Sequence, residues 1–333
     1  MLLMWFGMTG GIFFGWYFGA GNTDSGKEQP GVPFSLETQD AVPFTVIDIP
    51  GKGKGAIASR DIKQGELIIE ERPLFLVPPT INSSPTDFIW DKLEDVTEEQ
   101  RESFFNLSFV NFPADKDPET DLKDVALAIF ETNAVSAGSS VGIFPRMARL
   151  NHGCSSAFSA VYTYREKEGS LVVYAIKDVQ KGTELLITYS DTKQPREQRR
   201  AYLQKQYGFH CTCSVCSLPD DVSKASDNRL VEMNRHQSRL SQWIQRTVSG
   251  PEAIEHVRSI WKLGDEEGYW SERGRLAGDA VFVAAGHSEC VCFAAGHLGR
   301  SWRKRSLSNL TDIPLQCRCS SRVGINCHQV VHN

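Results

Sequence analysis

Cysteine is absent from the first 153 residues of this 333-residue chain. Cys154 is the first of nine cysteines, and the other eight all follow residue 200. A disulfide framework usually spreads its cysteines over a small secreted chain, so this distribution argues against one. It favours metal binding by thiolates in a reducing compartment.

Charge is absent from the first 23 residues, and residues 2–20 are mostly apolar or aromatic. This length approaches the ~20 residues that span a bilayer. The segment lacks the positive n-region and the small-residue cleavage site of a signal peptide, and its glycines weaken it as a helix. Residues 1–23 are therefore read as a hydrophobic leader. It is either a membrane anchor, with the downstream chain in the cytosol, or a disordered or over-extended start, and the sequence favours neither.

An excess of positive charge is also missing, because Asp and Glu outnumber Lys and Arg by 41 to 36. We therefore expect no direct binding to nucleic acid. The acidic balance suits a cationic protein substrate, and we expect the chain to be a monomer. Nucleotide-binding loops are missing too, since Gly51-Lys52-Gly53-Lys54-Gly55 matches neither the P-loop nor the G-x-G-x-x-G pattern. Alone, this run predicts a tight glycine turn.

Hydrophobic periodicity predicts short strands between residues 44 and 189, helices among and just after them, and further helices beyond residue 220. The expected strands cover 44–49, 56–77 with a break at 63–65, 158–164, 171–175 and 184–189. The expected helices begin after the capping box at Thr97 and cover 121–133, 196–207 and parts of 230–300. Residues 24–41 have the composition of a linker, and residues 301–333 show no periodicity.

Two segments of the chain resemble each other. Residues 60–69 (Arg-Asp-Ile-Lys-Gln-Gly-Glu-Leu-Ile-Ile) are similar to residues 177–187 (Lys-Asp-Val-Gln-Lys-Gly-Thr-Glu-Leu-Leu-Ile). Each predicts a strand, a glycine turn and a second strand. One such pair is too few for a solenoid, so it predicts two similar β-units in one β-rich domain.

A metal site is predicted by the C-x-C-x2-C run of Cys211, Cys213 and Cys216. Three thiolates are one short of the tetrahedral set of a structural zinc site. Cys154 is the one cysteine before residue 200, so we expect it to be the fourth ligand. The alternative is four free thiols.

Several motifs, in this order along the chain, resemble those of SET-domain methyltransferases. They are residues 51–58, 142–145, 150–154, 184–189 and 207–213. The resemblance covers roughly residues 42–217 and is strongest to the SET–MYND branch and related fungal proteins. The MYND finger itself is absent, because no cysteine lies between Met1 and Gly153.

The resemblance implies a mainly β, knot-like SET fold of several small sheets, with helical additions that make the chain α+β. The SET domain would cover residues 42–192, with a helical insertion near 80–133. A post-SET zinc segment would cover 193–219, a helical C-terminal region 220–300 and an irregular tail 301–333.

The resemblance also implies a role for individual residues. Tyr189 and Tyr207 match the active-site tyrosine and a second tyrosine of the lysine channel. The residues that match contacts to S-adenosylmethionine are Lys52, Gly53, Lys54, Asn133, Asn151, His152, Tyr189 and Phe209. The zinc ligands of the family match Cys154, Cys211, Cys213 and Cys216. Because tyrosine has a pKa of ~10, we expect Tyr189 to position and stabilise rather than to act as a simple base.

The implied function is S-adenosylmethionine-dependent N-methylation of a lysine on a histone or another protein, in the nucleus or the cytoplasm. The alternative is a zinc-stabilised SET scaffold that mediates protein interactions without turnover. The chain departs from the family at Gly153, where serine is usual, and at Ser155-Ser156-Ala157, where an Asn-Pro-type continuation is usual. We expect Arg196, Arg199, Arg200 and Lys205 to form a solvated helix face. The C-terminal cysteines fit no standard metal spacing and predict free thiols (Cys290, Cys292, Cys317, Cys319 and Cys327).

Overall fold

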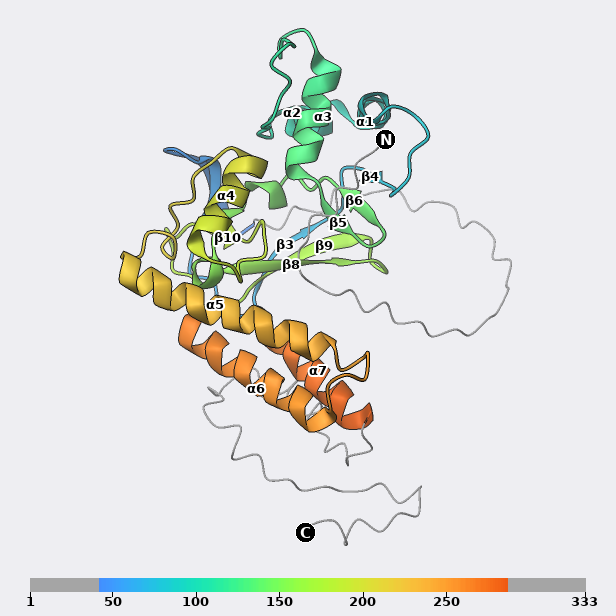
Figure 1. Ribbon diagram of the computed structural model, residues 1–333. Coiled ribbons are helices and arrows are strands. Elements are labelled where there is room, and N and C mark those ends of the chain that lie inside the picture. Colours follow the sequence, from blue (N-terminus) through green and yellow to red (C-terminus); the bar gives the residue numbers. More distant parts are fainter. Residues whose placement is uncertain (1–41, 287–333) are drawn as a thin grey trace, which may run out of the picture. The chain divides into compact units, whose positions relative to one another are not determined.

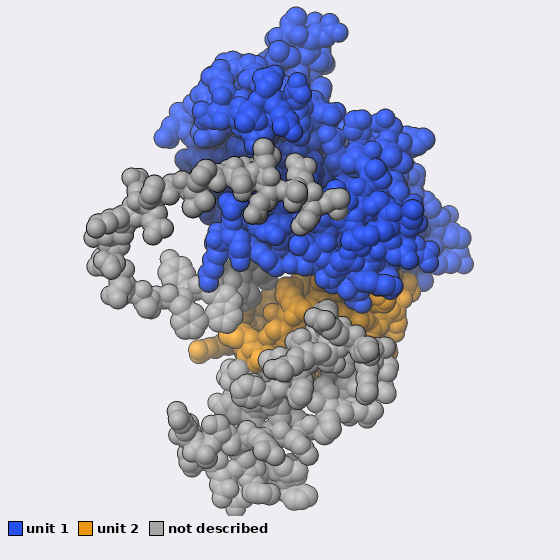
Figure 2. Space-filling model, turned by 180° about the vertical axis from the view of Figure 1, so that it is seen from behind, with its two compact units in different colours: residues 1–227 blue, residues 228–333 orange. Residues whose placement is uncertain are grey.

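The structure is a computed structural model that describes residues 42–286. The chain divides into two compact units, residues 1–227 and 228–333 (Figure 2). The predicted leader (1–23), linker (24–41), tail (301–333) and C-terminal cysteines lie outside the described residues. Within residues 42–286, none of the helices combines the length and the apolar composition needed to cross a membrane.

The strands of unit 1 form four small sheets, as expected for the fold class (Figure 1). β1 pairs with β2, β9 lies between β3 and β8, and β6 lies between β4 and β5, all antiparallel. β7 and β10 form a parallel pair that joins distant parts of the chain. The strands are β1 (Phe44–Ile49), β2 (Gly53–Ala58), β3 (Leu67–Glu71), β4 (Leu76–Val77), β5 (Val135–Ala137), β6 (Ser140–Gly142), β7 (Asn151–His152), β8 (Ala160–Arg165), β9 (Ser170–Ala175) and β10 (Leu186–Ile187).

The two similar segments found in the sequence pair with each other. Ile62 and Val179 exchange backbone hydrogen bonds of 2.8 and 2.9 Å. On either side, the Asp61 carboxylate accepts from the Lys181 amide and the Asp178 carboxylate accepts from the Gln64 amide, each at 2.9 Å. The contacts are reciprocal, so the repeat is a pair of equivalent β-units that meet at Ile62 and Val179.

Three helices form the insertion between β4 and β5: α1 (Pro85–Glu94), α2 (Glu98–Phe105) and α3 (Leu122–Asn133). They gather at one end of unit 1 (Figure 1). The predicted capping box is present, because Thr97 accepts from the Gln100 amide and Gln100 accepts from the Thr97 amide. Burial of apolar side chains such as Leu93, Phe104 and Ile129 holds the three helices together.

Helix α4 (Arg196–Tyr207) follows Pro195, as predicted, and ends where Gly208 adopts a left-handed conformation with φ of 69°. The expectation that its arginines form a solvated face is wrong. Arg199 is 1% exposed and pairs with Asp227 at 2.8 Å. A guanidinium this deeply buried needs a fixed partner, so Arg199 belongs to the interior, whereas Lys205 on the same helix is exposed as expected.

In unit 2, helix α6 (Gly250–Glu267) packs on α7 (Arg273–Gly286). The Ser249 hydroxyl accepts from the Glu252 amide and caps α6. Helix α5 (Asp220–Ser241) ends within this unit. There the Nδ1 atom of His236 lies 2.9 Å from the Nδ1 atom of His256 on α6. A helical C-terminal region is therefore confirmed as far as residue 286.

Candidate active site and metal centre

The four predicted cysteine ligands come together in unit 1. The sulfur atoms of Cys154, Cys211, Cys213 and Cys216 lie within 4.8 Å of one another, and all four residues are buried. The sulfur of Cys154 is 4.0 Å from that of Cys211 and 3.6 Å from that of Cys216. Four thiolates at 2.3 Å from a tetrahedral zinc would stand about 3.8 Å apart, whereas a disulfide needs about 2.05 Å. The donor set therefore fits a structural zinc ion.

Side chains from α4 and β7 contact this cluster. A guanidinium nitrogen of Arg199 lies 3.9 Å from the Cys216 sulfur. Arg200 donates to the carbonyls of Cys211 and Cys216 at 3.1 and 2.9 Å. The arginines thus fix the cysteine segment and supply positive charge beside thiolates, which stabilises the ionised sulfurs that bind metal.

His152 contacts the cluster from the other side. Its Nε2 atom lies 3.1 Å from the Cys154 sulfur, and its Nδ1 atom accepts the Tyr189 amide at 3.0 Å. Burial lowers the pKa of His152 to about 4, so the ring is neutral near pH 7. Because Nδ1 is the acceptor, the single ring proton lies on Nε2 and faces the sulfur.

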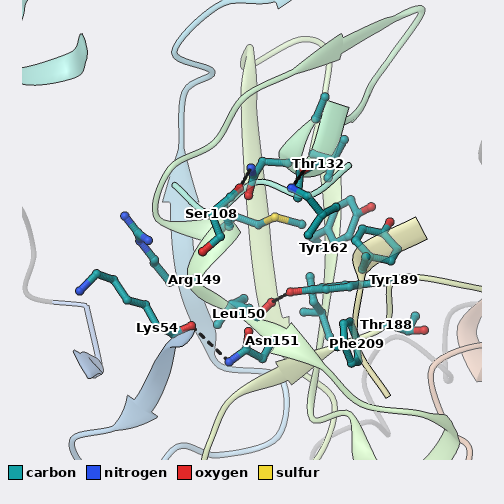
Figure 3. Close-up of a pocket in the computed structure, with 18 of the residues that line it drawn as sticks. Lys54, Ser108, Thr132, Arg149, Leu150, Asn151, Tyr162, Thr188, Tyr189 and Phe209 are labelled. Atoms are coloured by element: carbon teal, nitrogen blue, oxygen red, sulfur yellow. Dashed lines mark hydrogen bonds between the residues drawn. The ribbon is translucent and has the colours of Figure 1, made fainter. Parts of the chain in front are cut away.

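A cavity of about 250 Å³ lies beside the cysteine cluster in unit 1. Cationic side chains line one side of the cavity and aromatic side chains line the other. Lys54 and Arg149 extend to one side of it, while Tyr162 and Tyr189 stand at the opposite side (Figure 3). Tyr202, Tyr207 and Phe209 complete the aromatic part of the lining. Such a cavity offers cations to a carboxylate at one end and aromatic faces to a cation at the other.

Tyr189 is held at both of its ends. Its amide donates to His152, and its hydroxyl donates to the Leu150 carbonyl at 2.9 Å (Figure 3). Its ring lies 5.0 Å from that of Tyr207. Burial, followed by the neighbouring Tyr207, raises the pKa of Tyr189 above its ordinary value, and burial does the same for Tyr207. Both phenols therefore remain protonated at neutral pH and can donate hydrogen bonds but cannot serve as bases.

Asn151 is oriented by contacts on the cationic side of the cavity. Its amide donates to the Lys54 carbonyl at 3.2 Å and to Glu184 at 3.0 Å, and Glu184 also pairs with Lys52 at 2.6 Å. A Cβ atom on Gly55 would lie 2.7 Å from the Asn151 amide nitrogen. The glycine run thus lets the β1–β2 hairpin lie directly against Asn151.

The helical insertion also contributes to the cavity. Ser108, Val110, Thr132 and Asn133 are among its lining residues. The Asn133 amide donates to the Ser108 carbonyl at 2.8 Å, and the Thr132 hydroxyl accepts from the Val110 amide at 3.2 Å. These contacts fasten the segment after α2 to the end of α3, so the insertion forms one wall of the cavity.

The structure places most of the predicted site residues together. Tyr189 and Tyr207 line the cavity, as do Lys52, Lys54, Asn133, Asn151 and Phe209. Gly53 and His152 are not among the lining residues. Gly53 lies in β2 between the two lysines, and the His152 ring turns toward Cys154 instead. Their predicted contacts to a cofactor therefore stay predictions.

Sequence reasoning missed several residues of the site. Tyr162, Tyr202 and Arg149 line the cavity, and Glu184 orients Asn151. Glu71, on β3, accepts the amides of Arg146 and Met147 at 2.9 and 3.0 Å and so fixes the turn that leads to Arg149. The one available signal was Tyr202, an aromatic residue five positions before the predicted Tyr207 on the same helix.

Comparison with known proteins agrees with this geometry. Residues 53–190 match the family described as SET domain. These residues form a SET domain. Helix α4 and the segment with Cys211, Cys213 and Cys216 follow it directly.

Several curated relatives match the SET domain and its flanks. Histone-lysine N-methyltransferase set5 of Schizosaccharomyces pombe is 32% identical over 188 residues, which are 56% of this chain and 54% of that protein. Histone-lysine N-methyltransferase SMYD3 of Homo sapiens is 28% identical over 142 residues, 38% of this chain and 32% of that protein. The chain therefore spans about half the length of set5 and less of SMYD3. The solved structure of Rubisco LSMT bound to AdoMet matches with 14% identity and a TM-score of 0.38, covering 52% of this chain and 53% of that one.

The two departures from the usual SET motif are coupled in space. Residues Ser155–Ala157 form a 3₁₀ turn in which Ser155 has φ of 46°. This turn brings backbone close to Gly153, where a Cβ atom would lie 2.8 Å from the Phe158 nitrogen and 3.0 Å from the Ala157 carbonyl carbon. The unusual turn therefore requires glycine at position 153.

Restoring the usual serine should consequently harm this SET domain. We expect Gly153→Ser to lower the free energy of unfolding by about 1–3 kcal/mol, as overpacking does. Urea denaturation measures the change, and Ser156→Ala in the same turn serves as the control, with an expected change within about 0.5 kcal/mol. Unchanged stability of Gly153→Ser would show that the turn relaxes without cost.

Proposed function

We propose that the protein methylates lysine side chains of a protein substrate and uses S-adenosylmethionine as the methyl donor. The observation that carries the proposal is the cavity itself, with cationic side chains at one end and partly buried, protonated tyrosines at the other. The histone-lysine methyltransferase names of several relatives support the same chemistry. The proposal covers both histone and non-histone substrates, in the nucleus or the cytoplasm.

The residues present fit S-adenosylmethionine. Lys52, Lys54 and Arg149 suit its carboxylate, and Asn151 and Asn133 line the space between the two ends. Phe209 and the tyrosines offer aromatic faces to its sulfonium. When bound, it supplies an electrophilic methyl group to the neutral amine of the substrate lysine.

The protein's own contribution is alignment and polar stabilisation. A lysine amine has a pKa of ~10.4 in water, and a channel lined by Tyr162, Tyr189 and Tyr207 favours its neutral form by excluding solvent. The tyrosine hydroxyls remain protonated, so Tyr189 does not take the amine proton, which is lost to bulk solvent outside the channel. The in-line geometry of methyl transfer makes fixed positioning the main source of rate.

The proposal is tested on the full zinc-loaded chain. Calorimetry with S-adenosylmethionine should show binding, and labelled cofactor added to a cell lysate should transfer label to lysines of one or a few proteins. Binding without transfer would favour the alternative, a non-catalytic SET scaffold. Failure to bind the cofactor would overturn the proposal.

A further inference from the structure

We infer that His152 is a positioning residue that couples the cysteine cluster to Tyr189, an inference that rests on the proposed function of this site. It does not line the cavity, and it is 6% exposed. Its two ring nitrogens each contact a different part of the site. One faces the Cys154 sulfur, and the other receives the amide of the proposed catalytic tyrosine.

The backbone around His152 shows why the imidazole is needed there. β7 and β10 run parallel, and the Gly153 amide donates to the Ile187 carbonyl at 2.8 Å. Two residues later the ladder does not continue, and the Tyr189 amide donates to the His152 ring instead of to backbone. A side chain thus takes the place of a strand at the position where the chain turns Tyr189 into the cavity.

The segment that contains Leu150 and His152 accepts hydrogen bonds from both the amide and the hydroxyl of Tyr189. The Leu150 carbonyl accepts its hydroxyl, and His152 accepts its amide. His152 is in turn fixed by the sulfur of Cys154, which belongs to the cysteine cluster. The imidazole ring is rigid and carries a donor and an acceptor on opposite edges, so a shift of the cluster moves the tyrosine directly.

The charge of the cysteine cluster explains why the His152 ring donates to the Cys154 sulfur rather than accepting from it. A zinc ion with four thiolates carries a net charge of −2, and N–H donors to the sulfurs stabilise it. His152 supplies such a donor to Cys154, and Arg199 supplies another to Cys216. Binding of zinc and orientation of Tyr189 should therefore favour each other.

Two isosteric replacements separate the two contacts. His152→Asn retains an acceptor near Nδ1 for the Tyr189 amide but removes the donor to Cys154. His152→Gln retains a donor near Nε2 for Cys154 but removes the acceptor for Tyr189. His210→Asn is the matched control, because His210 is exposed and adjoins Cys211 in the sequence.

For His152→Asn we expect zinc affinity, measured by competition with a chromophoric chelator, to fall about 10–100-fold. Its kcat at saturating zinc should fall less than that of His152→Gln, because the acceptor for the Tyr189 amide remains. For His152→Gln we expect near-normal zinc affinity, an unchanged KM for S-adenosylmethionine and a kcat reduced about 10²-fold, the cost of a misplaced catalytic group. Circular dichroism shows whether each variant is folded.

Equal losses of zinc affinity and kcat in both variants would reduce His152 to a packing residue and overturn the inference. So would wild-type behaviour of both variants. If the wild-type protein transferred no methyl group, the proposed function would fail, while the zinc affinities of the Asn and Gln variants would still decide whether His152 contacts the cluster as inferred.

Discussion

Replacing Cys154 with serine is expected to abolish stoichiometric zinc binding and to lower the free energy of unfolding of the SET domain by several kcal/mol. Structural zinc sites in small domains bind with apparent free energies of about 10–16 kcal/mol, and that binding energy is coupled to folding. Cys154 lies two residues after β7, so a bound zinc ion would link β7 to the segment that carries Cys211, Cys213 and Cys216. Without it, nothing of comparable strength fixes residues 208–216 against β7.

The measurements are zinc content after gel filtration and chemical denaturation with and without a chelator. Cys290→Ser is the control, since it removes a thiol that is not one of the four predicted ligands. Methyl transfer should be lost before the β-sheets unfold, because Tyr207 and Phe209 lie only four and two residues before Cys211 in the chain. A serine variant with one bound zinc and wild-type stability would show that Cys154 is not a ligand.

Among the substitutions that leave the protein folded, Tyr189→Phe is expected to lower the kcat of methyl transfer most. It removes a hydroxyl that donates to the Leu150 carbonyl within the aromatic part of the cavity. Loss of one preorganised hydrogen-bond donor in an active site costs about 10²–10³-fold in kcat. We expect that loss in methyl transfer, with S-adenosylmethionine binding retained, because the ring and its contacts remain.

Tyr164→Phe is the matched control. Tyr164 lies on β8 and packs against Phe144 at a ring distance of 6.2 Å, and it is not among the residues that line the cavity. Its kcat should equal that of the wild-type protein. A Tyr189→Phe variant as fast as the wild type would remove Tyr189 from the mechanism.

The pH profile gives a second measure of the same assignment. The raised pKa of Tyr189 keeps its hydroxyl protonated well above neutral pH. The rate should therefore rise from pH 7 to 9 as the substrate amine loses its proton, without a decline from ionisation of Tyr189. A decline in this range that disappears in Tyr189→Phe would contradict the assignment.

Local sequence patterns predicted the elements that depend on neighbouring residues. The capping box at Thr97, the helix after Pro195 and the hairpin of β8 and β9 all form where the sequence placed them. The strand expected over 184–189 is shorter, Leu186–Ile187. It ends early because the Tyr189 amide pairs with a histidine ring rather than with another strand, and no local pattern could show that.

The site residues likewise fall into those that the sequence predicted and those that it misjudged. The cysteine spacing and the order of the motifs placed the four thiolates and the tyrosines, because those residue types have few other uses in such a pattern. The arginines of α4 were misjudged, since a charged helix face reads as solvated unless the partner that covers it is known. Asp227 and the cysteine segment, which pair with these arginines, follow them by at least ten residues in the chain.

By itself, then, the sequence determined the chemistry of this protein: four thiolates, a glycine-rich hairpin, an Asn-His pair and two tyrosines in a fixed order. Only the tertiary structure decided how they are connected. It placed the His152 ring against Cys154, made Gly153 a steric requirement of the Ser155–Ala157 turn and buried Arg199 beside the cluster. These outcomes depend on contacts between residues that the folded backbone brings within a few ångströms, and such distances are not encoded in local residue type or spacing.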